Sequence, residues 1–514
     1  MSERLRALRN LALSSVAAYV ENALGILASV LIARTLGPTE FAYYAFAIWL
    51  CGWLMRGCNH ALTTTSIRFI AEARGNRDDS LARSITGFTL RLQRVSSIIV
   101  LTIFVCAVVV VPPDEWRQDL FVIIVLIAVS VYSRAAFWML GAIGKGFERF
   151  EIENLSLMIA ALLNAAMVVG WSLAGGHWRG YLAIYCASSL VLVLAGKRLA
   201  KRHDVRPEHC ALPNDTRRRM TRHIGLTALI VLVGLASNRT IETALLKASS
   251  TAEAFAFFAI AGTLTKGAID FVTSGMAAVL LPAMSRAYGG KGPTAAAAAT
   301  SEAVRYYWIL GLLIAGLSIV VVPGMVSVLY GDVYEEAIPA IVISLVVAGL
   351  TTLGSALAAL QIAAERQSDQ LRVATTTVIA NLMLGLALVP AFGLMGAIAS
   401  SALSSLFSLA LTWRFVRQRV QVHIPLGIMC RNALAALVAS GAGAGATVLI
   451  DTRWAFVVGG IVFIIIYIVG MLMLRCFRHV DFAVFCQLSE RLGEPGRHLS
   501  RFAARLQTRF SASA

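Results

Sequence analysis

The stretch Phe41–Ala47 reads FAYYAFA, and 214 residues later Phe255–Ala261 reads FAFFAIA. Two further sets of residues recur in the same order at nearly the same spacing: Glu148, Arg149 and Asn164 return as Glu365, Arg366 and Asn381 (offset 217), and Gly180 with Ser188-Ser189-Leu190 returns as Gly396 with Ser404-Ser405-Leu406 (offset 216). Three matches at nearly one spacing indicate that a unit of about 200 residues was duplicated, and duplicated membrane halves are typical of transporters.

The composition predicts an all-α polytopic membrane protein. The chain has 514 residues, of which 58% are hydrophobic and 14% are charged, with a mean hydropathy of +0.75. Soluble proteins carry about 45–50% apolar and about 25% charged residues, so lipid is the main solvent here. None of the eight cysteines forms a CxxC pair and most lie in apolar runs. They are expected to be buried small hydrophobic residues, and no metal site or disulfide framework is predicted.

Fourteen apolar runs are long enough to span a membrane, since a spanning helix needs about 20 residues. They lie near 11–33, 42–64, 86–111, 119–142, 153–174, 180–197, 224–246, 255–281, 304–330, 338–362, 372–391, 394–413, 427–450 and 454–474.

The positive charges predict the orientation of these helices. With the N-terminus inside, 36 of the 45 Lys and Arg residues fall on cytoplasmic segments and five on external loops. This asymmetry follows the positive-inside rule and supports the count of fourteen helices. Both termini are therefore expected in the cytoplasm. Topology and attraction to anionic lipid explain the net charge of +17, so no nucleic-acid partner is predicted.

The repeat divides the predicted helices into domains. Residues 1–198 form an N-lobe of helices one to six, 199–222 a cytoplasmic linker, and 223–418 a C-lobe of helices seven to twelve. Six is even, so the two repeats are parallel. Residues 419–475 hold helices thirteen and fourteen, which have no counterpart in the repeat. Residues 476–514 form a cytoplasmic basic tail, in which apolar residues and arginines at helical spacing around 497–510 predict an amphipathic helix on the inner leaflet.

Ionisable residues within the predicted helices carry the functional prediction, because charges at membrane depth are costly and usually face a cavity or a partner. Arginine and lysine suit phosphate oxygens, and carboxylates suit gating or ion coupling. The predicted substrate-binding residues are Arg56, Arg239, Lys266 and Arg134. The predicted coupling or gating residues are Glu21, Asp270 and Glu242.

A structural interpretation of the same charges stays open. Lys266 and Asp270 are four residues apart and Arg239 and Glu242 three apart, so each pair shares a helix face. Such pairs could neutralise themselves and fix helix packing. Arg56 has no acid at helical spacing, which favours a ligand. At the repeat offset of 214, Asp270 occupies the position that corresponds to Arg56.

Three short segments resemble those of a known family. Leu31–Phe41 reads LIARTLGPTEF and resembles the segment ARxLGPxxFG that follows helix one in polysaccharide biosynthesis proteins. Leu281–Arg286 reads LPAMSR and is similar to LPxLSR at the end of helix eight. Gly393–Ala399 reads GLMGAIA and is similar to GxxGAAIA at the start of helix twelve. On these residues the chain resembles the oligosaccharide flippases of the multidrug/oligosaccharidyl-lipid/polysaccharide (MOP) exporter superfamily, over about residues 8–415.

The resemblance implies a V-shaped transporter of two lobes that works by alternating access and moves polyprenyl-pyrophosphate-linked oligosaccharides. In such relatives, basic residues of helices one, two and eight line a cationic cavity. Arg56 and Lys266 match helices two and eight, whereas helix one carries Glu21 instead of a basic residue. The implied partners are the lipid-linked oligosaccharide, membrane lipids and other proteins of polysaccharide assembly.

Two other functions compete with a flippase for O-antigen, capsule or exopolysaccharide assembly. An ion-coupled drug or small-molecule antiporter of the same superfamily would favour an acidic cavity, against the surplus of arginine and lysine here. A polysaccharide polymerase or ligase would need a sizeable external loop, and every predicted external loop is short. We therefore expect a transporter, not an enzyme, that needs no cofactor. A proton gradient, a sodium gradient or the membrane potential could drive it.

Overall fold

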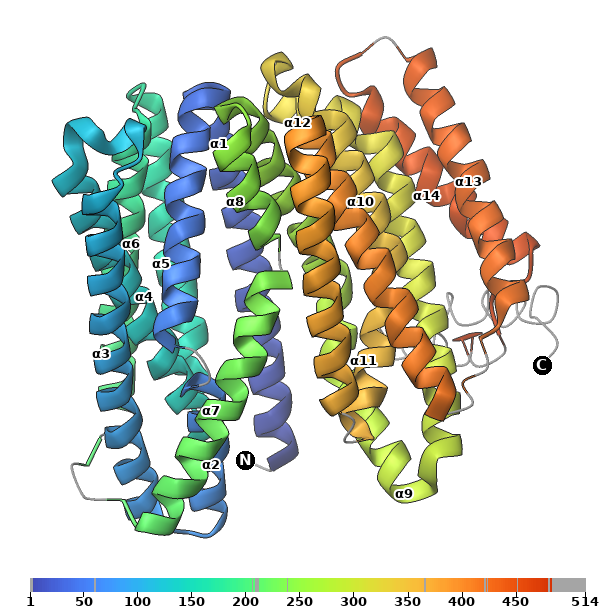
Figure 1. Cartoon of the computed structure of the whole chain (residues 1–514). Coiled ribbons are helices and arrows are strands. Elements are labelled where there is room, and N and C mark those ends of the chain that lie inside the picture. The colour runs from blue at the N-terminus through green and yellow to red at the C-terminus, as the bar shows by residue number, and fades with distance from the viewer. Residues whose placement is uncertain are drawn as a thin grey trace. The chain divides into compact units, whose positions relative to one another are not determined.

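The described part of the chain folds almost entirely into helices. The computed structural model describes residues 3–59, 62–205, 207–208, 212–237, 239–364, 367–419, 422, 424–450, 452–478 and 481–482. These residues contain fourteen α-helices and two 3-10 helices (Figure 1). Within these residues, eleven helical stretches are long and apolar enough to cross a membrane. The predicted fold class, an all-α polytopic membrane protein, is confirmed.

The elements follow one another as α1 Glu3–Asn59, α2 Leu62–Gly75, α3 Asp79–Val110, η1 Asp114–Asp119, α4 Leu120–Gly146, α5 Glu151–Leu173, α6 Trp178–Arg202, α7 Asn214–Ser237, α8 Thr240–Ser249, α9 Ala252–Leu329, η2 Asp332–Ala337, α10 Ile338–Thr351, α11 Gly354–Ala363, α12 Gln367–Arg419, α13 Leu426–Leu449 and α14 Ala455–Met473.

Three of the long helices each contain two of the predicted spanning runs. The two runs are separated by single glycines with positive φ, namely Gly37 (φ 70°) in α1, Gly292 (φ 80°) in α9 and Gly393 (φ 54°) in α12. Only glycine adopts such angles without strain. Gly37 and Gly292 are each followed by Pro-Thr, and proline favours the first turn of the next helix. The breaks are therefore tight turns, so the candidate spans Val16–Asn59 and Ser368–Gln418 are each long enough for two crossings.

Two predicted helices are interrupted in the structure. The run predicted near 224–246 is divided into α7 and α8, with Arg239 in the left-handed conformation (φ 57°) before α8. The run near 338–362 is divided into α10 and α11 at Thr352-Leu353. Apolar composition predicted continuous helices at both places, because both runs stay apolar across the break. Gly354 directly follows the second break, and no glycine or proline is adjacent to the first.

The repeat is visible in local structure. The six-residue 3-10 helices η1 and η2 precede α4 and α10 and begin 218 residues apart, at Asp114 and Asp332. At the same offset, Gly175 and Gly393 both have positive φ. The two 3-10 helices and the two positive-φ glycines recur at one offset, as a duplication predicts. A merely apolar chain would have no reason to repeat such irregular features.

The chain divides into two compact units, residues 1–259 and 260–514, with the boundary inside α9. In the first unit, α4 packs on α6 and α2, and α1 packs on α5 (Figure 1). Its core residues include Trp116, Ile127 and Phe137, which are almost fully buried. The lobe boundaries predicted at 198 and 223 describe the repeat and stay a prediction.

In the second unit, α13 and α14 form a hairpin and pack against the second half of α9. Phe463 and Tyr467 of α14 lie in a buried cluster with Leu312 and Val320 of α9. Tyr467 also donates a hydrogen bond to the backbone oxygen of Ile309 (3.0 Å). The two helices without a counterpart in the repeat are therefore an integral part of this unit.

Several predicted features lie outside the described residues. They are the repeated pair Glu365-Arg366 and the amphipathic helix around 497–510. Asn381, which belongs to the same repeated set as Glu365-Arg366, lies within the described residues. Its side-chain oxygen accepts a hydrogen bond from Ser400 (3.0 Å), which joins the two halves of α12.

Candidate functional site

Arg134 on α4 is the predicted site residue whose side chain is held most firmly. Its Nε donates to Ser189 Oγ (2.8 Å), and its guanidinium carbon lies 4.1 Å from the ring centroid of Tyr185. Both partners are on α6, and Ser189 Oγ in turn donates to the backbone oxygen of Tyr185 (2.6 Å). Among the described residues the guanidinium makes that one hydrogen bond, although it has five N–H donors. A half-buried cation with spare donors suits an anionic ligand.

Residues of α1 lie beside Arg134. Tyr44 and Cys51 are close enough to interact electrostatically with its guanidinium. At the end of α1, the Asn59 side chain donates to the backbone oxygen of Ala135 (3.2 Å). This contact ties the last turn of α1, which also carries the exposed Arg56, to the turn of α4 that carries Arg134. The structure thus places these two predicted residues in the same region of the first unit.

Arg239 lies at the break between α7 and α8. Its guanidinium carbon is 5.3 Å from the ring centroid of Phe258, and its Nη1 is buried without a hydrogen-bond partner among the described residues. Glu242, one turn along α8 and 1% exposed, attracts this charge. A non-glycine residue in the left-handed region is strained, and such strain often occurs at functional sites. Broken helices form many transporter binding sites.

The alternative, that Arg239 and Glu242 neutralise each other and only fix helix packing, also has support. Glu242 lies in the first turn of α8, where a carboxylate complements the helix dipole. A buried arginine beside a buried glutamate would hold the break in place without any ligand. The buried Nη1 is the atom that this interpretation leaves unexplained, because buried donors are almost always hydrogen-bonded.

Lys266 and Asp270 form the ion pair that their spacing predicts, within α9 in the second unit. The Lys266 side chain is 74% exposed and that of Asp270 39% exposed. An exposed ammonium on a spanning helix is costly in lipid, which favours a position facing water or a charged ligand. A weak exposed pair of this kind leaves the lysine able to change partners.

Glu21, the remaining predicted coupling residue, is half-buried on the first half of α1. It lies on the N-terminal side of the Gly37 kink, and Arg56 lies on the other side, near the far end of α1. Glu21 and Arg56 therefore lie on different halves of α1.

Sequence reasoning missed a charged contact between η1 and α8. Lys247 forms an ion pair with Glu115, and its ammonium lies 5.2 Å from the ring centroid of Phe46. Lys247 and Glu115 line a polar cavity of about 380 Å³ together with Tyr43 and Asp114. The partners are 132 residues apart, so no local spacing could reveal the pair.

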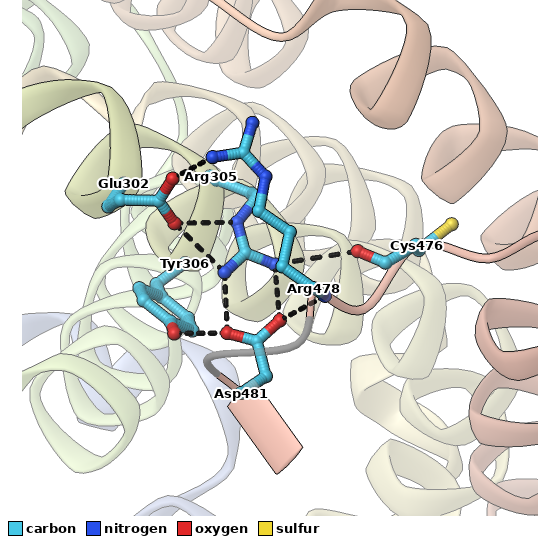
Figure 2. Close-up of polar contacts among 6 residues, drawn as sticks. All are labelled: Glu302, Arg305, Tyr306, Cys476, Arg478 and Asp481. Atoms are coloured by element: carbon cyan, nitrogen blue, oxygen red, sulfur yellow. Dashed lines mark hydrogen bonds and ion pairs between the residues drawn. The ribbon is translucent and has the colours of Figure 1, made fainter. Parts of the chain in front are cut away.

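A second missed cluster fixes the chain that follows α14. Arg305 of α9 is 1% exposed and binds both carboxylate oxygens of Asp481 (2.7 and 2.6 Å), as Figure 2 shows. Tyr306 donates to the same carboxylate, and Arg478 forms an ion pair with Glu302. Every charge in this network has an opposite partner, which indicates a structural role. No metal-binding group of His, Cys, Asp and Glu occurs in the described part of the chain.

Comparisons with known proteins place the chain in a family. The family model described as polysaccharide biosynthesis protein matches residues 7–288, and that of the lipid II flippase MurJ matches residues 152–467. No curated protein sequence matches the chain.

Solved structures share its fold. A lipid II flippase MurJ in an inward closed conformation has a TM-score of 0.72 at 12% identity, over 90% of this chain and 98% of the other. An inward-facing multidrug resistance MATE family transporter of the MOP superfamily has a TM-score of 0.61 at 14% identity, over 78% and 94%. A MATE transporter from Vibrio cholerae has a TM-score of 0.59 at 13% identity, over 81% and 98%. Each of the two family models matches more than half of the chain. The chain therefore belongs to the MOP superfamily of membrane transporters and matches both its polysaccharide biosynthesis family and its MurJ family.

Proposed function

We propose that this protein is a flippase that moves a polyprenyl-pyrophosphate-linked oligosaccharide across the bacterial inner membrane for the assembly of a surface polysaccharide. O-antigen, capsule and exopolysaccharide are all products of this class. The proposed mechanism is alternating access by two lobes, with both termini in the cytoplasm. The protein acts without catalysis, because transport needs binding and rocking but no bond cleavage.

The observation that carries this proposal is the way in which Arg134 is held. Moving a pyrophosphate through hydrocarbon is prohibitive, since desolvating an ion costs many kcal/mol. A guanidinium fixed by Ser189 and Tyr185 replaces part of that hydration and loses little side-chain entropy when it binds phosphate oxygens. The prenyl tail has no such barrier and can stay in lipid throughout.

The other predicted residues are also proposed to bind the substrate, each within its own unit. Arg56 lies in the same region of the first unit, and Arg239 has a buried donor at the start of α8, where the helix dipole favours an anion. Lys266 is exposed and could exchange Asp270 for a phosphate oxygen. Asp270, Glu242 and Glu21 are the proposed gating or coupling groups, which release the substrate or bind the driving ion.

An ion-coupled antiporter for drugs or other small molecules is the second candidate. The structural likeness to MATE transporters favours it, although their TM-scores of 0.61 and 0.59 are below the 0.72 of the MurJ flippase. Cationic drugs would need an acidic cavity, whereas three of the four proposed substrate residues are arginines.

Purified protein in proteoliposomes separates these candidates. A fluorescent polyprenyl-pyrophosphate oligosaccharide in the outer leaflet should become inaccessible to a membrane-impermeant quencher only in vesicles that contain the protein. A cationic dye inside the same vesicles should not be exported under a proton or sodium gradient. Export of the dye without movement of the lipid-linked sugar would contradict the flippase proposal and support the antiporter.

A further inference from the structure

An apolar groove runs between α5 and α6 in the first unit. It has a volume of about 330 Å³ and is lined by Ile159 of α5 and, from α6, by Val191, Leu194, Ala195, Arg198, Leu199 and Arg202. The α6 residues recur at helical spacing and so form one face. Ile159 is 50% and Leu194 51% exposed, and both belong to stretches apolar enough to span a membrane. The groove therefore offers an apolar, lipid-accessible surface that an acyl chain can contact.

Two arginines of α6 line this groove. Arg198 and Arg202 are exposed in the last turns of α6, four residues apart on one face. Within the described part of the chain, neither makes a hydrogen bond or an ion pair. Other basic side chains of the first unit do have acidic partners: Arg83 pairs with Glu208 (3.4 Å) and Arg219 with Glu72 (2.8 Å).

From this combination we infer that the α5–α6 groove is a binding site for an anionic phospholipid, separate from the substrate site. An acyl chain lies along Leu194 and Ile159, and the phosphate accepts hydrogen bonds from Arg198 and Arg202. Guanidinium groups bind phosphate oxygens in a two-pronged geometry, and their apolar stems can lie along the groove. Basic pockets between spanning helices on the cytoplasmic side are typical sites for anionic head groups.

The geometry distinguishes this site from general attraction to a negative surface. Lys197 and Lys201 are also exposed on the same turns of α6, but they do not line the groove. Each basic residue near a membrane surface contributes about 1 kcal/mol to binding of anionic lipid, which corresponds to roughly fivefold in affinity. General attraction to a negative surface would depend equally on the two lysines and the two arginines. A specific site in the groove would depend on the arginines alone.

The test is native mass spectrometry of the intact protein in detergent, titrated with phosphatidylglycerol. The Arg198→Ala/Arg202→Ala double variant should bind phosphatidylglycerol roughly 30-fold more weakly than the wild type. The matched control, Lys197→Ala/Lys201→Ala, removes the same charge from the same helix and should change the affinity less than threefold. Equal losses in both double variants, or no loss in either, would overturn the site.

Two further arms define what the groove recognises. Phosphatidylcholine should bind much more weakly than phosphatidylglycerol, and glycerol 3-phosphate, which has the phosphate without acyl chains, should not compete. Leu194→Trp fills the groove but keeps both arginines, and it should weaken phosphatidylglycerol binding as well. Competition by glycerol 3-phosphate, or full binding in Leu194→Trp, would reduce the site to a surface anion contact and contradict the inference.

Discussion

At the scale of single residues, the charges within the spanning helices differ in how they are held. Arg134 has a fixed side chain with spare donors, Arg239 a buried donor in a strained break, and Lys266 an exposed, replaceable partner. Residue type and position in a helix identified all three from sequence. The partners Ser189 and Tyr185 of Arg134 could not be predicted, because they depend on how α4 packs against α6.

Arg56→Ala should remove surface polysaccharide from cells while the protein remains in the membrane. Losing a charge-assisted hydrogen bond of about 1.5–3 kcal/mol lowers transport at least tenfold. Arg56→Lys keeps the charge and should restore part of it. Arg117→Ala, which removes an exposed arginine paired with Asp114 (2.9 Å), is the control and should have no effect. Normal glycan in a well-expressed Arg56→Ala strain would exclude a substrate role.

Glu21→Gln tests ion coupling. The half-buried carboxylate is the proposed proton or cation site, so the neutral amide should remove the dependence of the transport rate on an imposed pH gradient. The rate is measured in proteoliposomes over a series of gradients. If the variant responds to the gradient as the wild type does, Glu21 is not the coupling residue.

At the scale of elements, close packing depends on glycine at positions that composition does not reveal. A Cβ on Gly311 of α9 would lie 2.1 Å from the backbone oxygen of Gly349 on α10, and one on Gly349 would lie 2.3 Å from that of Gly311. Small residues at helix interfaces let backbones approach in membrane proteins. The sequence predicted both helices, but which glycines meet follows only from the fold.

Gly311→Ala should therefore destabilise the protein by about 1–3 kcal/mol, since α9 and α10 must separate. Gly25→Ala is the matched control: a Cβ there meets no atom within 4 Å, and alanine is the better helix former by about 1 kcal/mol. Thermal unfolding in detergent should show a lower melting temperature for the first variant only. Equal melting temperatures would contradict the close contact.

The network at the end of α14 predicts a pH dependence. Burial raises the pKa of Asp481, but hydrogen bonds from Arg305 and Tyr306 outweigh it and hold the pKa below the ordinary value of 3.8. A lowered pKa stabilises the fold above the unfolded pKa, and this stabilisation is lost as the pH falls through the folded pKa. Asp481→Asn should thus lower the melting temperature at pH 5–8 and lose this effect at lower pH.

Breaking a buried ion pair costs about 3–5 kcal/mol, whereas exposed pairs contribute about 0–1 kcal/mol. The control for Asp481→Asn is therefore Asp114→Asn, which removes an exposed pair with Arg117 and should leave the melting temperature almost unchanged. A pH-independent effect of Asp481→Asn would show that the carboxylate charge is not what stabilises this region.

At the scale of the whole molecule, the duplication organises the fold. The repeated motifs, the alternation of positive charge and the glycines at 37 and 393 were readable from sequence and fixed the class of protein. The break at Arg239 and the contact of Lys247 with Glu115 were not, because they arise from tertiary packing between segments far apart in the chain. The sequence therefore located the charges within the spanning helices, whereas the contacts that hold them follow only from the fold, and their roles stay predictions.

The most direct measurement of the proposed function is the rate at which a fluorescent polyprenyl-pyrophosphate oligosaccharide is flipped in proteoliposomes, compared between the wild type, Arg134→Ala and Lys201→Ala. Arg134 is held beside Ser189 on α6, and Lys201 is an exposed lysine of α6. The wild type and Lys201→Ala should flip the lipid at similar rates, and Arg134→Ala at least tenfold more slowly, the loss expected for a charge-assisted hydrogen bond. Flipping by Arg134→Ala at the wild-type rate, or no flipping by the wild type, would contradict a transporter that carries its substrate on fixed cations.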